Sequence, residues 1–254
     1  MSDFTITHNR GFAEYRLMRP ESRNSLTFEM YQAIEDLCKS PGDAGVIVLT
    51  AEGDKAFASG TDISKFKDFQ SAQDAINYEA MIGRVIDAVQ TSSVPVIASL
   101  HGVVAGGGAA IAAAADVRLA TPDTRFGMPI ARTLGNCLSV ANLNRFVHLL
   151  GESRTRYLML TAEFLEIDSL ITSGFVSEIL ESASLCDQRA RDLAIHMTKL
   201  APLTISATRD GLSRLAMRSI PADIDLIRRC YLSDDFFEGI NAFFAKRKAN
   251  WSGQ

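Results

Sequence analysis

The sequence of 254 residues has few cysteines and no closely spaced pair of them. Cys38, Cys137, Cys186 and Cys230 lie tens of residues apart, so no C-x-x-C motif is present to bind zinc or to carry out thiol redox chemistry. We therefore expect a reduced, cytoplasmic setting and no metal site.

The chain also lacks long apolar runs and an excess of basic residues. No window approaches the roughly 20 apolar residues that span a bilayer, and residues 1–10 do not show the basic-then-apolar pattern of a secretory signal. Lys and Arg total 26 against 30 Asp and Glu, a net charge of -4, which argues against sequence-independent binding to nucleic acid or anionic lipid. The sequence therefore predicts a cytoplasmic protein with no nucleic-acid or membrane partner.

Proline and glycine are too scarce for a repetitive or disordered chain. The sequence has 7 Pro and 17 Gly, with 47% hydrophobic and 22% charged residues, which is close to the average of globular proteins. This composition excludes collagen-like and low-complexity chains. The length suits one large α/β domain or a domain with a helical appendage.

Strand and helix patterns alternate in the first half of the chain. Strand patterns cover 4–8, 12–17, 46–50, 94–100 and 116–120, and helical patterns cover 27–39, 72–90 and 106–115. This alternation predicts an α/β fold with a parallel sheet. Residues 106–115 are apolar all round, so we expect that helix to lie inside the protein. Helical patterns then dominate after residue 138, at 138–150, 153–160, 185–200, 203–216, 223–232 and 233–246.

The segment 56–63, with the sequence AFASGTDI, is the first candidate for a functional site. Gly60 in an otherwise strand-like run indicates a sharp bend or a close backbone approach, so the amide of Thr61 could point at a ligand. The other interpretation is an ordinary turn, in which Asp62 caps a short helix that begins near Ser64.

The second candidate is the segment 101–108, HGVVAGGG, where a buried strand runs into the buried helix. Glycines at a helix start let backbone N–H groups and the positive end of the helix dipole face an anion or a developing oxyanion. The alternative is that Gly106, Gly107 and Gly108 permit tight packing of helix against strand. Their spacing does not match the G-x-G-x-x-G dinucleotide motif. Taken together, the two segments predict an oxyanion hole built from one amide of each.

Six stretches of the chain resemble, in the same order, the crotonase or enoyl-CoA hydratase/isomerase superfamily. They are RPESRNSL (19–26), FASGTDI (57–63), VPVIASLHGVVAGGG (94–108), DVRLA (116–120), RFGMP (125–129) and the segment from SDDFFEG (233–239) through Phe243 to Lys246, Arg247 and Lys248. The resemblance implies a crotonase-like spiral of ββα units with a helical C-terminal trimerisation region. It divides the chain into a core with the acyl-CoA site, 1–195, and an oligomerisation region, 196–254.

The resemblance also implies the ligand and the assembly. The substrate would be a CoA thioester whose carbonyl accepts hydrogen bonds from the amides of Thr61 and Gly107, with the adenosine along Ser59–Ser64. Such a hole stabilises a thioester enolate, and one well-aimed donor is worth about 3 kcal/mol. CoA is part of the substrate, no metal or redox cofactor is required, and the chain would form a homotrimer or a dimer of trimers. The implied substrate-binding residues are Arg23, Ser25, Ser59, Thr61, Asp62, Ile63, Ser64, Gly106, Gly107 and Lys246.

The match fails at the two glutamates with which family hydratases activate water and deliver a proton. Ala110 and Ile130 occupy those positions, and neither can transfer a proton. The segment 135–137, Gly-Asn-Cys, resembles the Gly-Asn-Asp of the aroyl-CoA dehalogenase branch, which would put Cys137 at the nucleophile position. The other interpretation of Cys137 is a small buried hydrophobic residue. Arg132 could bind an acyl carboxylate bidentately or form a surface ion pair.

These observations predict a cytoplasmic crotonase-fold oligomer of the enoyl-CoA hydratase/isomerase type. Its reaction would be hydration, a double-bond shift, or C–C or dehalogenase-like cleavage through a stabilised enolate. Two alternatives stay open: a non-catalytic acyl-CoA-binding homologue, motivated by the absent glutamates, and a nucleotide-binding α/β module that uses the Gly-rich helix start. We interpret His101, at the end of a strand beside the proposed pocket, as a structural residue.

Overall fold

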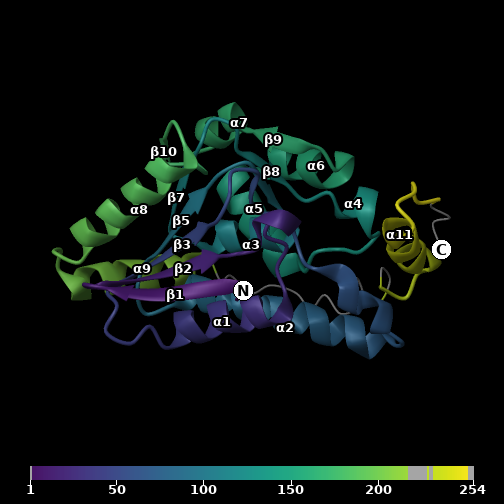
Figure 1. Cartoon of the computed structure of the whole chain (residues 1–254), viewed down its shortest axis with the longest axis horizontal. Coiled ribbons are helices and arrows are strands. Elements are labelled where there is room, and N and C mark those ends of the chain that lie inside the picture. The colour runs from purple at the N-terminus through teal and green to yellow at the C-terminus, as the bar shows by residue number, and fades with distance from the viewer. Residues whose placement is uncertain (1, 217–227, 229–230, 251–254) are drawn as a thin grey trace.

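Two β-sheets with helices around them make up the part of the chain that the computed structural model describes, residues 2–216, 228 and 231–250 (Figure 1). The larger sheet has the strand order β1-β2-β3-β5-β7-β10 and the smaller sheet the order β4-β6-β8-β9. The strands are β1 (Phe4–Asn9), β2 (Phe12–Leu17), β3 (Val46–Ala51), β4 (Ala56–Ala58), β5 (Val96–Leu100), β6 (Val103–Ala105), β7 (Val117–Ala120), β8 (Arg125–Gly127), β9 (Phe164–Glu166) and β10 (Glu178–Ile179).

Most of the predicted helices are present. The described helices are α1 (Phe28–Lys39), α2 (Ala72–Thr91), α3 (Gly106–Ala114), α4 (Ile130–Thr133), α5 (Val140–Leu150), α6 (Glu152–Thr161), α7 (Ile167–Thr172), α8 (Ala183–Met197), α9 (Pro202–Ala216) and α11 (Asp234–Phe244), with the 3-10 helices η1 (Pro20–Ser22) and η2 (Ile63–Asp68). The helix predicted at 223–232 falls almost entirely outside the described residues. Thr27 caps α1 as expected, because its side chain accepts a hydrogen bond from the Met30 amide.

The chain repeats one structural unit, a strand in each sheet followed by a helix. Strands β3, β5 and β7 run parallel and adjacent in the larger sheet, and β4, β6 and β8 do the same in the smaller sheet. Helix α2 follows β4 and helix α3 follows β6, so each turn of the chain adds one strand to each sheet before its helix. This arrangement confirms the predicted α/β spiral of ββα units.

Strand β3 shows why a continuous apolar run forms the centre of the larger sheet. All residues of Val46–Ala51 are buried. Successive side chains point to opposite faces, so Ile47 joins the main core, whereas Val48 joins a second cluster with Cys186 and Ala190 of α8. The sheet is therefore covered on both faces, which is what parallel strands require.

Helix α3 runs through the interior, as its apolar sequence predicts. Its run Gly108–Ala114 is buried and consists mostly of alanine, whose short side chain lets neighbouring elements approach closely. A Cβ added to Gly108 would lie 2.5 Å from the Cβ of Ala58, which ends β4. Close packing of helix against strand therefore accounts for this glycine.

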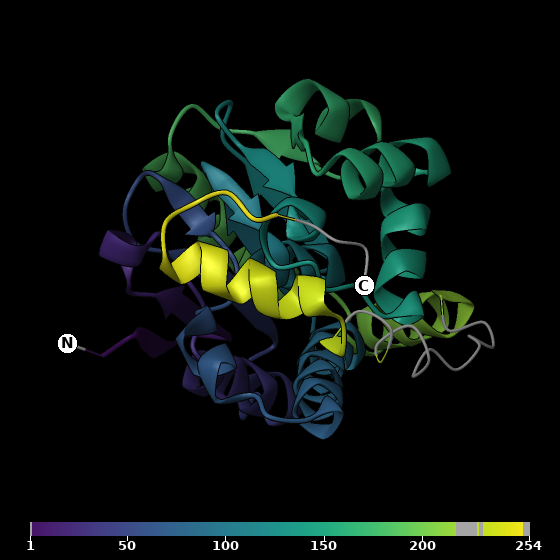
Figure 2. The same ribbon diagram turned by 90° about the vertical axis from the view of Figure 1, so that its right-hand side faces the viewer.

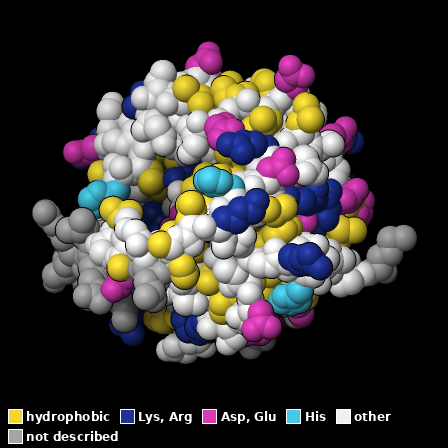
Figure 3. Space-filling view, turned by 90° about the vertical axis from the view of Figure 1, so that its left-hand side faces the viewer, with side chains coloured by type: hydrophobic (Ala, Val, Ile, Leu, Met, Phe, Trp, Pro, Cys, Tyr) yellow, Lys and Arg dark blue, Asp and Glu magenta, His cyan; other side chains and the backbone are white. Residues whose placement is uncertain are grey.

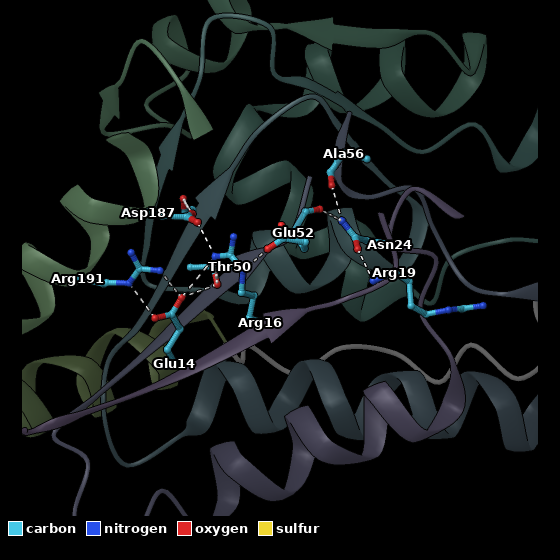
Figure 4. A network of polar contacts seen from close by, with 10 residues as sticks. Glu14, Arg16, Arg19, Asn24, Thr50, Glu52, Ala56, Asp187 and Arg191 are labelled. Carbon is cyan, nitrogen blue, oxygen red and sulfur yellow. Dashed lines mark hydrogen bonds and ion pairs between the residues drawn. The ribbon is translucent and has the colours of Figure 1, made fainter. Parts of the chain in front are cut away.

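An ionic network fills the space between the larger sheet and α8 (Figure 4). Arg16 on β2 donates to Asp187 on α8 at 2.7 Å, and Arg191 donates to Glu14 through Nε at 2.8 Å. The hydroxyl of Thr50 donates to the same Glu14 at 2.8 Å. Buried charges are tolerated only when they are paired and hydrogen-bonded, and the two buried carboxylates of this network, Glu14 and Asp187, each have at least two such partners.

Acidic and basic side chains are interspersed on the face of the molecule that carries α8 and α9 (Figure 3). Among the described residues of this face, no large area of one sign is visible. At the opposite end of the molecule, α11 lies between η2 and α4 (Figure 2). It packs through Phe236 and Ile240 against Ile63 and Phe66 of η2, which joins the C-terminal region to the segment after β4.

Candidate functional site

A pocket of about 500 Å³ lies where the loop after β4, the start of α3, helix α2, the end of β8 and α11 meet. It is lined by the positions predicted from the family resemblance, Arg23, Ser25, Ser59, Thr61, Asp62, Ile63, Ser64, Gly106, Gly107, Ala110 and Ile130. Another cavity, of about 460 Å³, is lined by residues of α2, α3, α5 and α9 and contains none of the predicted site residues. The 500 Å³ pocket is therefore the candidate site.

The amide of Thr61 is left without a backbone partner by the pairing of its loop. Leu26 and Thr61 form a parallel bridge, in which the Leu26 amide donates to the Gly60 carbonyl at 2.8 Å and the Asp62 amide donates to the Leu26 carbonyl at 2.8 Å. In such a bridge the amide of the middle residue points away from the partner strand. Among the described residues, the Thr61 amide makes no backbone hydrogen bond.

Among the described residues, the amide of Gly107 has no backbone partner, because it lies at the start of a helix. Helix α3 begins at Gly106, so the Gly107 N–H lies in the first turn, where no carbonyl of the helix can accept it. The residue before the helix, Ala105, provides no side-chain cap. A Cβ added to Gly107 would lie 3.3 Å from Oγ1 of Thr61, so the structure brings the two predicted donors together.

Strand pairing sets the distance between these two loops. Strands β4 and β6 are parallel neighbours, with Ala58 paired to Val104, and Thr61 and Gly107 follow their carboxyl ends. Ligands of α/β sheets bind at this edge, beyond the carboxyl ends of the strands. Two N–H donors placed there can polarise a carbonyl oxygen that lies between them.

A chain of hydroxyl groups behind the Thr61 loop was not predicted from the sequence. The Thr61 hydroxyl is 2.8 Å from the hydroxyl of Tyr31 on α1 and 2.8 Å from that of Tyr78 on α2. Burial raises the pKa of both tyrosines, so both phenols stay protonated. The side chain of Thr61 is thus held from two helices, which orients its backbone. A Cβ on Gly107 would also clash with the Tyr31 hydroxyl, so only glycine fits there.

Asp62 has a structural role, as the alternative interpretation of its segment proposed. Its side chain accepts from the Ser64 amide at 3.1 Å and so caps η2, and it accepts from Arg19 at 3.1 Å. Burial alone would raise the pKa of Asp62, but the hydrogen bonds from Ser64 and Arg19 lower it overall. Asp62 is therefore a carboxylate that anchors the Thr61 loop.

A second carboxylate of the pocket, Glu79 on α2, was also missed. Its side chain is buried, lines the pocket and accepts a hydrogen bond from the hydroxyl of Tyr231. The same hydroxyl accepts from Nδ2 of Asn136 at 3.2 Å. The signal in the sequence is the position of Glu79 on the apolar stripe of α2, four residues after Ala75 and three before Ile82, where an acid is unusual.

The remaining predicted residues lie at or beyond the rim of the pocket. Arg132 is exposed and pairs with Glu163 at 3.8 Å, in agreement with the surface ion pair that was one of its two interpretations. Cys137 is half-buried, packs against the apolar cluster of η2 and α11, and does not line the pocket. Lys246 is exposed in the turn after α11, close in sequence to Phe244, which lines the pocket.

His101 is fully buried at the end of β5, and neither of its ring nitrogens has a hydrogen-bond partner among the described residues. Burial is the main cause that lowers its pKa, so the imidazole is neutral. It does not line the pocket, which agrees with a structural residue. Within the described ranges there is no cluster of three or more potential metal ligands, and no helix there combines the length and the apolar character needed to cross a membrane.

Comparison with known proteins places this geometry in a family. The model of the enoyl-CoA hydratase/isomerase family matches residues 7–254. A crotonyl-CoA hydratase of Syntrophomonas wolfei is 27% identical over 92% of this chain and 91% of its own length. The structure of an enoyl-CoA hydratase/carnithine racemase from Magnetospirillum magneticum superposes with a TM-score of 0.78 at 25% identity and covers 100% of this chain and 97% of that one. A methylmalonyl-CoA decarboxylase has the same fold, with a TM-score of 0.87 at 23% identity and coverage of 100% and 99%.

Proposed function

Because this chain belongs to the enoyl-CoA hydratase/isomerase family, we propose that its pocket binds the thioester of an acyl-CoA and polarises the carbonyl between the amides of Thr61 and Gly107. The observation that carries the proposal is the pair of amides beyond the ends of two adjacent parallel strands that have no backbone partner in the part of the chain that the structure describes. Negative charge that develops on the thioester oxygen is stabilised there, so an enolate becomes accessible.

The wall of the pocket suits an acyl chain. Ile82, Ala110, Met128, Ile130 and Leu138 give it an apolar lining on the side of α2, α3 and α4. Such side chains bind a hydrocarbon by removing its surface from water, at roughly 25 cal/mol per Å². Since Ala110 and Ile130 stand where family hydratases have glutamates, the acyl chain meets no acid at those two positions.

The CoA moiety extends to the mouth of the pocket in this proposal. Ser59, Asp62 and Ser64 provide polar groups along the loop for the adenosine. Arg23 is exposed at the end of η1, and Lys246 is exposed in the turn after α11. Their positive charges can pair with the phosphates of CoA, although the net charge of the chain is -4.

We propose further that the chain works as a cytoplasmic homotrimer or dimer of trimers through residues 196–254. Support comes from large apolar side chains that are exposed on the C-terminal helices. Leu212 on α9 is 63% exposed, and Phe237 and Phe243 on α11 are 41% and 54% exposed. Exposed apolar side chains of this size commonly mark association surfaces.

The amide of Gly107 can be tested by comparing two substitutions at that position. Gly107→Ala and Gly107→Pro both introduce a Cβ toward Tyr31, but only proline removes the amide. We place both in a Tyr31→Phe background, which removes the hydroxyl that the Cβ would meet and leaves the ring carbon Cζ at 2.9 Å, so that the same small shift of the ring is required in both variants. Infrared spectroscopy of bound butyryl-CoA, labelled with carbon-13 at the thioester carbonyl, then reports hydrogen bonding to that oxygen.

We expect the carbonyl stretch to move to lower frequency on binding to the alanine variant. In the proline variant it should lie closer to the frequency of free butyryl-CoA. Enolate formation should fall 10²–10³-fold in the proline variant relative to the alanine variant, as on loss of one oxyanion donor. Equal carbonyl shifts in two folded variants would contradict the proposal. Absence of butyryl-CoA binding to the unaltered protein would contradict it as well.

A further inference from the structure

The hydroxyl chain of Tyr31, Thr61 and Tyr78 has one more proton than it has hydrogen bonds. Its three O–H groups carry three protons, and it contains two hydrogen bonds, both with the Thr61 hydroxyl at 2.8 Å. Burial raises the pKa of each phenol, so neither gives up its proton. Within the described ranges, neither phenol has another hydrogen-bond partner. One proton of the chain is therefore left to be donated elsewhere.

The surroundings of the Thr61 hydroxyl determine where its own proton points. The Oγ1 atom of Thr61 has the phenol of Tyr31 on one side and the phenol of Tyr78 on another. Gly107 lies against the same atom, since a Cβ added to Gly107 would be 3.3 Å from it. The Thr61 proton therefore goes to one of the two phenols, and the other phenol donates to Thr61.

The two arrangements differ in which phenol keeps the spare proton. If Thr61 donates to Tyr31, the spare proton belongs to Tyr31, which is 0% exposed and does not line the pocket. A buried O–H without an acceptor costs free energy. If Thr61 donates to Tyr78, the spare proton belongs to Tyr78, whose side chain lines the pocket. The second arrangement is favoured, and it directs the chain from Tyr31 through Thr61 to Tyr78 and into the pocket.

Tyr78 reaches the pocket beside the proposed position of the thioester. Only the Thr61 side chain and one hydrogen bond of 2.8 Å separate its hydroxyl from the Thr61 amide. One helical turn further along α2, Ile82 belongs to the apolar wall that suits an acyl chain. An acceptor for Tyr78 therefore belongs to the first carbons of the acyl group, close to the thioester carbonyl.

We propose that Tyr78 determines specificity by donating a hydrogen bond to a neutral oxygen on the third carbon of the acyl group, so that the pocket selects 3-oxoacyl thioesters over saturated ones. This inference rests on the proposed function, because the thioester must first be bound between Thr61 and Gly107. An oxygen on the third carbon can lie on the same side as the thioester oxygen, so both reach donors of one loop. A neutral oxygen suits the pocket better than a carboxylate, because the acidic residues Asp62 and Glu79 already line it.

Two carbon-13 labels separate this inference from the proposed function. In 3-oxobutyryl-CoA bound to the full chain, a label at carbon 3 reports hydrogen bonding to the ketone through its infrared stretch, and a label at carbon 1 reports the amides of Thr61 and Gly107. We expect the ketone stretch to move to lower frequency on binding to the unaltered protein. In Tyr78→Phe it should lie close to that of the free ligand, while the carbon 1 stretch stays shifted in both proteins.

Calorimetry then compares the Kd of 3-oxobutyryl-CoA with that of butyryl-CoA. The unaltered protein should bind the 3-oxo compound at least about tenfold more tightly, because the saturated one leaves the Tyr78 O–H without an acceptor. Tyr78→Phe should lose this preference, and its Kd for butyryl-CoA should change less than about threefold. Tyr31→Phe is the matched control, since it removes a phenol of the same chain but leaves Thr61 to donate to Tyr78, and it should keep the preference. Tyr15→Phe removes a buried phenol that donates to the Met30 carbonyl at 3.1 Å outside the pocket, and it should keep the preference as well.

The proposal is overturned if the ketone stretch does not move on binding to the unaltered protein, or if it moves equally in Tyr78→Phe. It is also overturned if Tyr31→Phe abolishes the preference as completely as Tyr78→Phe, since the effect would then belong to the packing of the chain and not to a donor on Tyr78. A shift at carbon 1 without a shift at carbon 3 leaves the proposed function standing without this inference. If neither acyl-CoA binds to the unaltered protein, both are wrong.

Discussion

Asn24 connects the segment before α1 to the strand that carries the Thr61 loop, and replacing its side chain should lower the free energy of unfolding. The residue is 1% exposed and adopts a φ of 52°, a conformation that Asn and Gly tolerate best. Its side-chain oxygen accepts from the Arg19 amide at 2.9 Å, and its side-chain nitrogen donates to the carbonyls of Glu52 at 2.9 Å and Ala56 at 2.8 Å (Figure 4). Asn24→Ala would break all three hydrogen bonds and leave buried backbone groups without partners.

The expected loss follows from these contacts. A buried hydrogen bond contributes about 1 kcal/mol net, so three account for about 3 kcal/mol. The left-handed backbone of a residue with a Cβ costs about 1 kcal/mol more, which gives about 4 kcal/mol for Asn24→Ala. Asn24→Gly loses the same hydrogen bonds without the backbone strain and should lose about 3 kcal/mol. For a chain of this size each kcal/mol lowers Tm by roughly 2–4 °C.

Thermal unfolding followed by circular dichroism measures this loss. We expect Tm to fall by at least about 8 °C in Asn24→Ala and by less in Asn24→Gly. Because the Leu26–Thr61 bridge continues from this segment, both variants should also bind butyryl-CoA more weakly. A drop of Tm below about 2 °C in both variants would refute the reasoning, since the hydrogen bonds would then contribute no more than about 1 kcal/mol together.

Two further predictions concern pH. Burial alone would raise the pKa of Glu14, but hydrogen bonds from Arg191 and Thr50 lower it below 4.5, so this carboxylate stabilises the fold above that pH and the contribution is lost as the pH falls. Urea denaturation gives the free energy of unfolding of the unaltered protein and of Glu14→Gln. The difference between the two should therefore shrink as the pH falls from 5 to about 3. A difference that stays constant would argue against this role of Glu14. Burial lowers the pKa of His101 below 6.5, so the unfolded chain binds the proton more readily and stability falls as the pH drops below that value. His101→Leu should lose less stability than the unaltered protein between pH 7 and about pH 5 in the same assay, and equal losses would contradict this account.

The sequence was sufficient for the elements that show their own periodicity or composition. Helix α1 has a Thr27 cap and an apolar stripe, and the run Gly108–Ala114 contains no polar residue, so its burial could be predicted. Strands β6 and β8 were missed, and β4 was seen only as a strand-like run, because three residues are too few to show alternation and each strand exists only through pairing with the next. Strand β9 is equally short and pairs with β8.

The parts of the candidate site that depend on backbone conformation could be predicted from the sequence. The parts that depend on contacts between side chains far apart in the sequence could not. Glycines marked the loops of Thr61 and Gly107, and the family resemblance placed the positions of Ala110 and Ile130. The contact of Glu79 with Tyr231 joins residues 152 positions apart, so the unusual acid on the apolar stripe of α2 could be seen in the sequence but its partner could not. The stretch RPESRNSL (19–26) has a physical role as well, because Asn24 hydrogen-bonds to the carbonyl of Ala56 and Leu26 forms a bridge with Thr61.

The parallel pairing of β4 with β6 has a consequence for how such a pocket can evolve. Neighbouring strands lie about 4.8 Å apart in every sheet, so the separation of the two loop amides is inherited from the sheet itself and is independent of which side chains surround them. Substitutions on α2, α3 or α4 can add, remove or relocate an acid without altering that separation. In our proposal the two backbone amides thus polarise the thioester carbonyl whatever side chains surround them. The reaction that follows depends on a small set of side chains that substitutions can change.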